Sequence, residues 1–576
     1  MIEIQHSLAH YYPELGPKLK KFEAIFTLLE KLFHLPEINQ FINNNKHLKN
    51  FTFLDAVLKE FDFSYRISNK CLQRIPAEGK VIIIANHPIG SLDGLALLRM
   101  VYDVRSDVKV MASSLLGMIE PLNELFLSVD NISKQVSYKK RQSQLNAIND
   151  TLNNDQALII FPAGEVSRMT PKGIMDGAWK TSFIRLAERH QAPIVPVFID
   201  SRNSMMFYAS SLMYKPLSSL LLIHEMYKQK SQSASFTVGE MIVPSAWKHL
   251  DLPRKKLAKR FKKHVFKLTK NKPQFQTTTS IAHPIKRKRL YTEISQHKPL
   301  GCTADGMHIY LIPYQADSQV IQEIGRLREL SFRQVNEGTG RCSDIDSYDV
   351  HYQHLLVWNP NLMDVVGAYR IGFCEELIQA NGLSGLYCNN LYQIDDKLIG
   401  MASQSIELGR SFVQPKYWGM RGLEYLWYGL GALLANNPQI NYLFGAVTIP
   451  GHYSQHALNE LVNYYRHYHP KPDTAPNFTA RNPFKCEVKS KNAMPPSDAR
   501  AAFKELNKSL KNQGYKVPML FKQYTDLCIP GGVGFVDFAV DQGFNDCVDG
   551  LIWLDITQMK EQKRKRYINQ NNLKSA

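Results

Sequence analysis

The sequence predicts an α/β protein made of two domains, and three observations support this prediction. The chain has 576 residues, which is more than one hydrophobic core usually holds. Short apolar runs of strand length alternate with helical stretches twice, first over 76–270 and again from residue 306. Between these blocks, residues 271–305 contain Pro, Thr and Ser and four consecutive basic residues, which is typical of a linker.

The chain therefore divides into four expected segments. Residues 1–75 are predicted to be helical, because apolar residues recur there at helical spacing, at Phe22, Ile25, Phe26, Leu29 and Phe33. In the first α/β domain, residues 76–270, we expect strands at 81–85, 157–161 and 194–199 and helices at 95–101 and 178–189. The second domain, residues 306–576, shows an α/β pattern to about residue 470 and continues in an extension.

The formal net charge is +18, and much of this excess lies in one segment. Between Pro253 and Arg289 there are fourteen Lys or Arg and no Asp or Glu, which predicts an anionic partner for one surface. No apolar run approaches the roughly 18 residues that span a bilayer, and the N-terminus lacks the pattern of a signal peptide. We therefore expect a cytoplasmic protein that is peripheral on the inner face of the cell membrane.

Cysteine spacing and glycine motifs limit the chemistry that the chain can carry out. The eight cysteines form no C-x2-C or C-x4-C pair, so we expect no metal site, and scattered thiols suit a reducing cytosol. Neither G-x-x-x-x-G-K-[ST] nor G-x-G-x-x-G occurs, which argues against nucleotide-dependent chemistry.

The run VIIIANHPIGSLDGLALLRM places His87 just beyond a buried strand and Asp93 in the first turn of the next helix, for which Ser91 is the expected N-cap. A turn this short brings the Asp carboxylate to one imidazole nitrogen. The other nitrogen is then free to take a proton from an acceptor hydroxyl, which is general-base acyl transfer. A purely structural alternative is that His87 is a loop residue and Asp93 favours the helix dipole.

A second run, ALIIFPAGEVSR, is another buried strand that ends at Pro162 and continues into Gly164, Glu165 and Arg168. The ends of strands in α/β sheets are where ligands bind, so these three residues are candidate contacts for the acceptor.

Together, the two runs resemble the motifs of the lysophospholipid (glycerolipid) acyltransferases, which have an N-H-x4-D block and an F-P-E-G-T-R-S block. The resemblance covers roughly residues 70–250 and implies His87 as base and Asp93 as its orienting group. Two departures stand out: five residues separate His87 from Asp93, and the second block is F-P-A-G-E. Because that block is thought to hold the acceptor's phosphate, the change suggests an acceptor with a different headgroup.

In the second domain, Asp344, Asp346 and Asp349 lie within six residues, before an apolar strand. Such a cluster binds a cationic group, coordinates a hard metal or forms a solvated loop. Glu407 and Arg410 bracket another strand end, where a structural ion pair is the simple alternative.

As a set, R-x3-F, D-x-D-x2-D, G-x2-R and E-x2-R resemble the acyl-homoserine-lactone synthases and the related ornithine-lipid N-acyltransferases of the GNAT superfamily. This resemblance implies a GNAT-like mixed-sheet α/β fold in the C-terminal domain. The resemblance to the lysophospholipid acyltransferases implies a glycerolipid-acyltransferase-like α/β fold in the N-terminal domain. A tryptophan of the lactone synthases is missing, which favours the lipid-forming relatives, and the pyrophosphate loop is degenerate, which favours a carrier-protein donor. The matching positions are Arg328, Phe332, Asp344, Asp346, Asp349, Arg370, Glu407 and Arg410. The resemblance implies that Glu407 and Arg410 are catalytic and that the other six bind the substrate.

The segment 253–270 is predicted to be a basic amphipathic helix. Its apolar face is Leu257, Ala258, Phe261, Val265 and Leu268, opposite a face of seven lysines. This pattern indicates an anchor to anionic lipid, while a helix packed on its own domain fits equally well. No aromatic residues interleave the lysines, so we expect no nucleic-acid partner.

Both halves together resemble bifunctional aminolipid synthases, which make ornithine or glycine lipids. The resemblance implies that the C-terminal domain N-acylates an amino acid with a 3-hydroxyacyl chain, and that the N-terminal domain then O-acylates the lyso-lipid. No cofactor is expected beyond a thioester donor, on acyl carrier protein or coenzyme A, and the expected partners are acyl carrier protein and an anionic membrane surface. The alternative is a lysophospholipid acyltransferase with a GNAT-like accessory domain.

Overall fold

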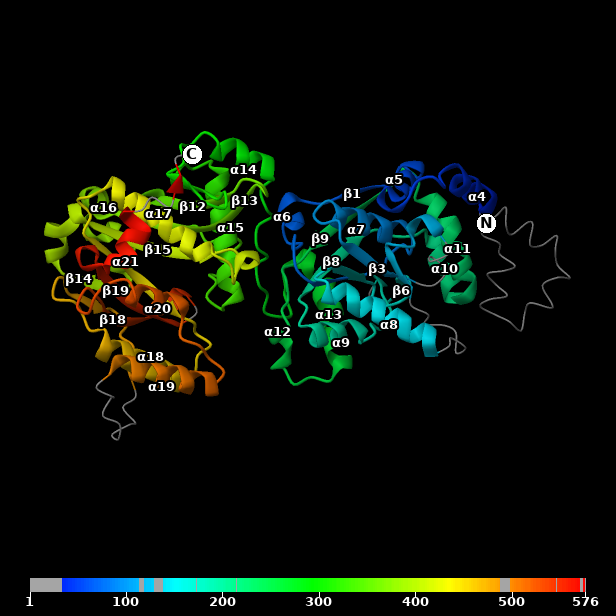
Figure 1. Cartoon of the computed structure of the whole chain (residues 1–576). Helices are drawn as coiled ribbons and strands as arrows, with labels where there is room; N and C mark the ends of the chain where they lie inside the picture. Colours follow the sequence, from blue (N-terminus) through cyan, green and yellow to red (C-terminus); the bar gives the residue numbers. More distant parts are fainter. Residues whose placement is uncertain are drawn as a thin grey trace. The chain divides into compact units, whose positions relative to one another are not determined.

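The computed structural model divides the chain into two compact units, Met1–His283 and Pro284–Ala576 (Figure 1). The helical run predicted around Phe22 and Phe33 lies outside the residues that the structure describes. No helix in the described part is both long and apolar enough to cross a membrane. The described residues are 34–112, 119–128, 138–171, 173–213, 215–486, 498–544, 546–569 and 573–574.

The first unit is built on a seven-stranded sheet that is parallel except where β8 and β9 meet. Its three central strands, β8, β2 and β5, are the ones that the apolar runs of the sequence predict. In spatial order the strands are β1 (Ser64–Arg66), β9 (Ser233–Val238), β8 (Ile194–Asp200), β2 (Val81–Ala85), β5 (Ala157–Ile160), β3 (Val108–Ala112) and β4 (Phe126–Ser128).

Helices cover both faces of this sheet, because its central strand is apolar on both sides. Val81, Ile83 and Ala85 of β2 face one core, which α5 (Asn50–Glu60) and α7 (Leu92–Tyr102) complete. Ile82 and Ile84 face the other, with α8 (Tyr138–Asn153), α9 (Ser182–His190) and α13 (Arg254–Val265). The remaining elements are α4 (Leu35–Asn44), α6 (Asn69–Leu72), α10 (Met205–Met213), α11 (Lys215–Lys228), α12 (Ser245–Lys248), β6 (Arg168–Thr170) and β7 (Gly173–Met175).

The basic helix α13 packs on its own domain. Leu257, Ala258, Phe261 and Val265 of its predicted apolar face are buried in the core beneath the sheet. The α-helix ends at Val265, and the chain continues in a short 3-10 turn, Leu268–Lys270. The predicted wheel is therefore correct for the helix, and the domain core takes up the apolar face that a lipid anchor would need.

The expected linker, 271–305, contains ordered structure on both sides of the division between the units. Phe275 packs on Phe261 at a ring separation of 4.3 Å, and the Ser280 hydroxyl donates to the carbonyl of Arg74. Beyond the division, helix α14 (Arg287–Ile294) buries Leu290 and Ile294, which lie four residues apart and therefore on one helical face. The basic run at 286–289 thus begins a helix of the second unit, which differs from the linker that its composition suggests.

The second unit is built on a nine-stranded, mostly antiparallel sheet. Three of its strands, β18, β19 and β20, come from the predicted C-terminal extension, so this extension completes the sheet at both edges. In spatial order the strands are β18 (Val533–Asp541), β19 (Cys547–Asp555), β16 (Tyr442–Ile449), β15 (Ser405–Val413), β13 (Asp364–Phe373), β12 (Gln353–Asn359), β11 (His308–Pro313), β10 (Gly301–Thr303) and β20 (Leu573–Lys574).

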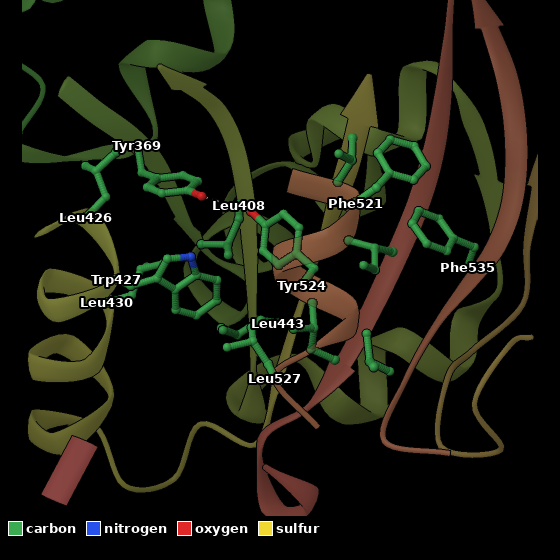
Figure 2. Packing of buried hydrophobic residues seen from close by; sticks show 14 of the residues in the cluster. Tyr369, Leu408, Leu426, Trp427, Leu430, Leu443, Phe521, Tyr524, Leu527 and Phe535 are labelled. Atoms are coloured by element: carbon green, nitrogen blue, oxygen red, sulfur yellow. Dashed lines mark hydrogen bonds between the residues drawn. The ribbon is translucent and has the colours of Figure 1, made fainter. Parts of the chain in front are cut away.

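Aromatic side chains fill the largest core of this unit, between the sheet and its helices (Figure 2). The Tyr369 and Tyr524 hydroxyls lie 3.0 Å apart, and Trp427 meets the Tyr524 ring edge-on at 5.6 Å. Phe521 stacks on Phe535 at 4.8 Å. A small separate sheet pairs β14 (Tyr392–Ile394) with β17 (Phe478–Ala480). The α-helices of the unit, besides α14, are α15 (Gln319–Gln334), α16 (Cys374–Asn381), α17 (Gly422–Asn436), α18 (Gln455–Tyr468), α19 (Ala499–Asn512), α20 (Met519–Thr525) and α21 (Glu561–Arg564).

We expect Phe521→Ala to lower the free energy of unfolding of this unit by about 3–5 kcal/mol, because the change leaves a cavity among packed rings. The matched control is Met519→Ala on the same helix, where the side chain is 71% exposed. It should change stability by less than about 0.5 kcal/mol. Denaturant unfolding of the two variants, followed by hydrogen exchange in β18 and β19, makes the comparison; equal losses would contradict this account of the core.

Candidate active sites

The first candidate site lies where β2 ends, because a polar residue there joins two strands. The Asn86 side chain donates to the carbonyl of Ile199 and accepts from its N–H, at 2.9 and 2.7 Å. These bonds continue the pairing between β2 and β8 for one residue more. The next residue, His87, is therefore held at the carboxyl edge of the sheet, where parallel α/β sheets bind ligands.

The predicted pair forms: His87 Nδ1 lies 3.0 Å from Asp93 Oδ2. The Asp93 carboxylate is fully buried and also accepts the backbone N–H groups of Ile89, Ser91 and Gly94, at 2.9–3.1 Å. Ser91 occupies the N-cap position of α7, but its hydroxyl makes no hydrogen bond to another described residue. The Asp93 carboxylate accepts the backbone N–H groups at the start of the helix in its place. The five residues between His87 and Asp93, one more than in the family motif, thus form a compact turn that brings the two side chains into contact.

The pKa values of the pair follow from this geometry. Burial works to lower the pKa of His87, but the charge of Asp93, its hydrogen bond and the charge of Asp176 together raise it above the usual value. Burial works to raise the pKa of Asp93, and the charge and hydrogen bond of His87 with the backbone N–H groups bring it below the usual range. The Asp is thus an anion that orients the imidazole, and Nε2 remains to accept a proton.

Asp176 belongs to this site, although no sequence motif predicts it. It is buried, and its Oδ1 accepts the N–H of His87 at 3.3 Å and the hydroxyl of Ser167 at 2.5 Å. Its Oδ2 accepts the indole N–H of Trp179 at 2.8 Å. One carboxylate therefore ties the His87 turn to the segment that follows β5. Its sequence neighbourhood, MDGAW, offers only a turn signal.

The second predicted motif lies beside the first, because β2 and β5 are parallel neighbours. The Ser167 N–H donates to the His87 carbonyl at 2.8 Å, and the His87 ring stacks on Phe161 at 4.2 Å. Gly164 has a φ of 64°, so a side chain there would be strained, whereas its Cβ would only displace the end of the Lys180 side chain, whose Nζ would lie 2.8 Å away. Glu165 follows in the same loop, and Arg168 begins β6.

Part of this site lines one cavity of about 2470 Å³, which is larger than the roughly 300–1,000 Å³ typical of small-ligand sites. His87, Gly164, Glu165 and Arg168 all contribute to its wall. Much of the remaining lining is apolar, which suits a fatty acyl chain. This apolar wall includes Phe41, Ile42, Phe53, Val57, Val110, Leu122, Phe126 and Ile148.

The second candidate site lies where two parallel strands of the second unit separate. Strands β15 and β16 pair only from Ser405 to Glu407, while both continue to pair with their other neighbours. At the point of separation a Cβ on Gly445 would lie 2.1 Å from the Leu408 carbonyl oxygen, so the closest approach requires glycine. Beyond it, the facing strand edges leave backbone groups unpaired with each other, which is where N–H groups can stabilise an oxyanion.

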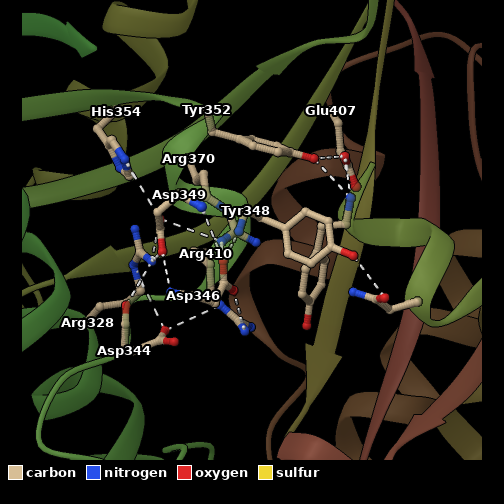
Figure 3. Close-up of polar contacts among 12 residues, drawn as sticks. Arg328, Asp344, Asp346, Tyr348, Asp349, Tyr352, His354, Arg370, Glu407 and Arg410 are labelled. Carbon is tan, nitrogen blue, oxygen red and sulfur yellow. Dashed lines mark hydrogen bonds and ion pairs between the residues drawn. The ribbon is translucent and has the colours of Figure 1, made fainter. Parts of the chain in front are cut away.

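Glu407 lies at this separation and holds a loop in place. Its buried carboxylate accepts the N–H groups of Tyr387 and Cys388, at 3.0 and 2.7 Å, and the hydroxyl of Tyr352. Glu407 does not pair with Arg410, which rules out the simple ion pair between these two (Figure 3). With three donors on one carboxylate, the geometry favours a positioning role for Glu407.

The three predicted aspartates and three predicted arginines form one network, in which Asp346 and Arg410 are partly exposed and the other four are buried (Figure 3). Arg328 Nη1 contacts Asp349 Oδ1 at 3.1 Å, and Arg370 Nη1 contacts Asp346 Oδ1 at 2.7 Å. Arg410 Nε lies 3.3 Å from Asp344 Oδ2. Each carboxylate therefore meets a guanidinium, so the cluster is neither a solvated loop nor an open set of oxygen ligands. In the described part of the chain, no group of three or more His, Cys, Asp or Glu is placed to hold a metal ion.

Charge compensation sets the pKa values in this network. Burial works to raise the pKa of Asp349, but the charges of Arg328 and Arg370 bring it well below its usual range. Burial lowers the pKa of the neighbouring His354 to about 3, so this ring is neutral. Asp349 therefore stays ionised across the physiological range and does not titrate near neutral pH as a general base would.

Arg410 turns out of its strand toward two rings. Its φ is 49°, a left-handed value that is unusual for a residue with a side chain. Its guanidinium lies 4.8 Å from the Tyr387 ring and 4.8 Å from the Phe544 ring. The predicted Phe332 packs edge-on against Phe544 at 5.4 Å. Phe332 and Arg410 are therefore linked through Phe544, and Arg328 is linked to Arg410 through Asp344, which both arginines approach.

The sequence motifs do not predict a further acidic residue of this site, Asp549. Asp549 of β19 lies opposite Thr448 of β16 and accepts its hydroxyl at 2.6 Å. By the alternation of strand residues it lies on the same face of the sheet as Glu407. Nearby are Asp541 and Glu337, and none of these three acids makes an ion pair within the described residues. The only sequence signal is the crowding of Asp residues around 541–549.

Burial raises the pKa of Asp549 to about 7, with a further contribution from the charge of Asp541. Burial likewise raises the pKa of Glu337 to about 8, and the charge of Asp549 adds to it. Asp549 therefore titrates in the range where a carboxylate can take a proton from an amine at neutral pH.

Comparison with known proteins agrees with this division into two sites. Residues 6–250 match the family model described as acyltransferase, and residues 327–428 match the model described as acetyltransferase (GNAT) domain. The chain is similar to a glycine N(alpha)-acyltransferase of Phocaeicola vulgatus, 31% identical over 304 residues that cover 50% of this chain and 92% of that protein. It is also similar to a lyso-glycine lipid O-acyltransferase of Bacteroides thetaiotaomicron, 29% identical over 260 residues that cover 44% of this chain and 90% of that protein.

A third relative is an L-ornithine N(alpha)-acyltransferase of Brucella abortus, 34% identical over 114 residues that cover 19% of this chain and 39% of that protein. One chain thus matches nearly the full length of an N-acyltransferase and of an O-acyltransferase. It is an enzyme that transfers acyl groups.

We expect Asp93→Asn to lower the pKa of His87, because the variant removes the charge that opposes burial. The rate of His87 carbethoxylation by diethylpyrocarbonate, followed by peptide mass spectrometry across pH 5–9, reports this pKa. The midpoint should lie above about 6.5 in the parent and fall in the variant. Asp103→Asn, a change on an exposed carboxylate away from the cavity, serves as control; an unmoved midpoint in Asp93→Asn would refute the pairing.

Proposed function

We propose that this chain, which belongs to the aminolipid acyltransferase family, carries out two successive acyl transfers that build an amino-acid-containing membrane lipid. The C-terminal domain N-acylates an amino acid with a 3-hydroxyacyl chain. The N-terminal domain then O-acylates the hydroxyl of the resulting lyso-lipid. One observation carries this proposal. The chain has two separate candidate sites, and it matches nearly the full length of two proteins that are named for these two reactions. Those names make glycine the first amino acid to test and ornithine the second.

In the N-acylation, the amine nitrogen attacks the thioester carbonyl where β15 and β16 separate. The C–N bond forms, the C–S bond breaks, and the thiolate leaves and takes up a proton. The ammonium must first lose a proton, and Asp549 is the carboxylate whose pKa, about 7, suits this step. We assign Glu407 to the positioning of the loop at Tyr387 and Cys388, and Arg410 to the wall that the amino acid meets.

In the O-acylation, His87 Nε2 takes the proton of the acceptor hydroxyl as its oxygen attacks a second thioester. Asp93 holds the ring and stabilises the imidazolium that forms. The proton then passes to the leaving thiolate. Gly164, Glu165 and Arg168 line the same cavity and are proposed to contact the acceptor, while the apolar wall takes the acyl chain.

Both reactions need an acyl thioester and no further cofactor in this scheme. We propose acyl carrier protein as the donor of the 3-hydroxyacyl chain. Because the intermediate and the product are amphiphiles, we place the enzyme at the cytoplasmic face of the membrane, as a peripheral protein. Fusion of the two domains raises the effective concentration of the single-chain intermediate at the second site.

His87→Ala is expected to block the second transfer alone. Loss of the base should lower O-acylation by about 10²–10⁴-fold, so cells that express the variant accumulate the monoacyl aminolipid and lose the diacyl form. Mass spectrometry of lipid extracts measures both. The matched variant Asp549→Asn should instead remove both lipids. Unchanged diacyl product in His87→Ala would remove His87 from the mechanism.

The N-acylation rate should rise with pH through about 7 and level off above it, because the proton acceptor is the ionised form of Asp549. Asp541→Asn removes a neighbouring negative charge, so it should lower the pKa of Asp549 and move this limb of the profile to lower pH. Initial rates at saturating thioester between pH 5 and 9 make the test. A limb that persists unshifted in Asp549→Asn would assign it to another group.

A further inference from the structure

The cavity of the first unit has a cationic rim in addition to its apolar wall. Helix α13 contributes Lys255, Lys259 and Lys262, and helix α9 contributes Arg185 and Arg189. The lysines are spaced at i, i+4 and i+7 and the arginines at i and i+4, so each set forms one stripe along its helix. The two stripes belong to helices that pack against each other, since α9 and α13 share one core.

These positive charges are left largely without partners. The ion pair between the two helices, Arg254 with Glu188 at 2.9 Å, uses neither stripe. Within the described part of the chain, Arg185, Arg189, Lys255 and Lys259 make no ion pair. The carboxylates that line the cavity are Glu37 and Glu60, from α4 and α5, and Glu165, from the loop after β5. The rim formed by α9 and α13 therefore carries an excess of positive charge.

The inner end of the lysine stripe connects to the catalytic turn. Lys262 Nζ donates to the carbonyl oxygens of Asp176 and Gly177, and Asp176 in turn accepts the N–H of His87. Lys255 lies seven residues away along α13, which is about 10 Å at the helical rise of 1.5 Å per residue. The stripe thus leads from the neighbourhood of His87 outward to exposed lysines.

On the basis of the proposed function, we propose that this rim binds the phosphate of the 4′-phosphopantetheine arm that carries the acyl donor. The acyl chain lies along the apolar wall and the thioester meets His87, so the arm leaves along the opposite, charged side. The acceptor hydroxyl is neutral and its lyso-lipid carries one carboxylate, which needs fewer cations than the rim provides. Coenzyme A and acyl carrier protein share this phosphate, and both are therefore candidate sources.

This assignment changes the role of the basic helix. Of its lysines, Lys255, Lys259 and Lys262 line the cavity, while Lys256 and Lys263 are exposed and do not. A membrane anchor would use the exposed lysines of both sets alike, whereas phosphate binding uses only the set that lines the cavity. The two sets lie on one helix and allow a matched comparison.

The experiment compares K255Q/K259Q with K256Q/K263Q in the full-length protein, since both pairs remove two charges from α13. We expect K255Q/K259Q to raise the KM for acyl-coenzyme A or acyl carrier protein in O-acylation at least tenfold, with kcat within twofold of the parent. K256Q/K263Q should stay within twofold in both. An acyl-pantetheine donor that lacks the phosphate should be used equally by parent and variants, and the donor with the larger rise in KM identifies the source.

Two further measurements keep the outcomes distinct. Calorimetric titration of 4′-phosphopantetheine should give binding that K255Q/K259Q weakens about tenfold, and this holds even if O-acylation itself is not detected. Sedimentation with anionic phosphatidylglycerol vesicles tests the anchor. Equal effects of the two double variants on KM, or vesicle binding lost only in K255Q/K259Q while its donor KM is unchanged, would overturn the proposal.

Discussion

Buried carboxylates that accept backbone N–H groups hold both candidate sites in shape. Asp93 accepts hydrogen bonds from three backbone N–H groups and pairs with the His87 ring. Glu407 accepts hydrogen bonds from two backbone N–H groups and the Tyr352 hydroxyl. A buried carboxylate without such donors would be very costly, so each loop is fixed by the need to satisfy one charge. Asp176 does the same between the two loops of the first site. Replacing any of these by an apolar residue would release a loop, which is a larger change than the loss of one contact.

The network of Arg328, Arg370 and Arg410 with the three aspartates follows the same constraint with full charges. Taking six ions out of water costs several kcal/mol per ion, and only close pairing offsets this cost. Removing one member leaves an uncompensated charge, whereas the intact network is neutral. Its benefit is geometric: it fixes Arg410 in a left-handed conformation between the Tyr387 and Phe544 rings, at the point where β15 and β16 separate. A strained residue held this firmly is typical of a functional site.

The sequence predicts what depends on local patterns. Strands β2, β5 and β8, the His87–Asp93 turn and the face of α13 follow from apolar periodicity and from spacing within a few residues. Asp176 and Asp549 could not be predicted in this way, because their roles depend on partners on other strands and loops. The C-terminal strands β18 and β19 lie beyond a long stretch without α/β alternation, so their place beside β16 appears only in the folded sheet. The core contacts of α13 agree with the alternative of a helix packed on its own domain, which the sequence leaves open beside a lipid anchor.

The two sites differ in charge as the two reactions would require. A hydroxyl keeps its proton until the carbonyl is attacked, so its base must be unprotonated and held within reach of that proton, and a histidine oriented by Asp93 meets this need. An amine arrives as an ammonium ion and must be deprotonated before it attacks. Carboxylates with raised pKa values, Asp549 and Glu337, can attract the cation and then take its proton. The positive rim of the first site would repel such an acceptor. The charge around each site thus favours the acceptor of its own reaction.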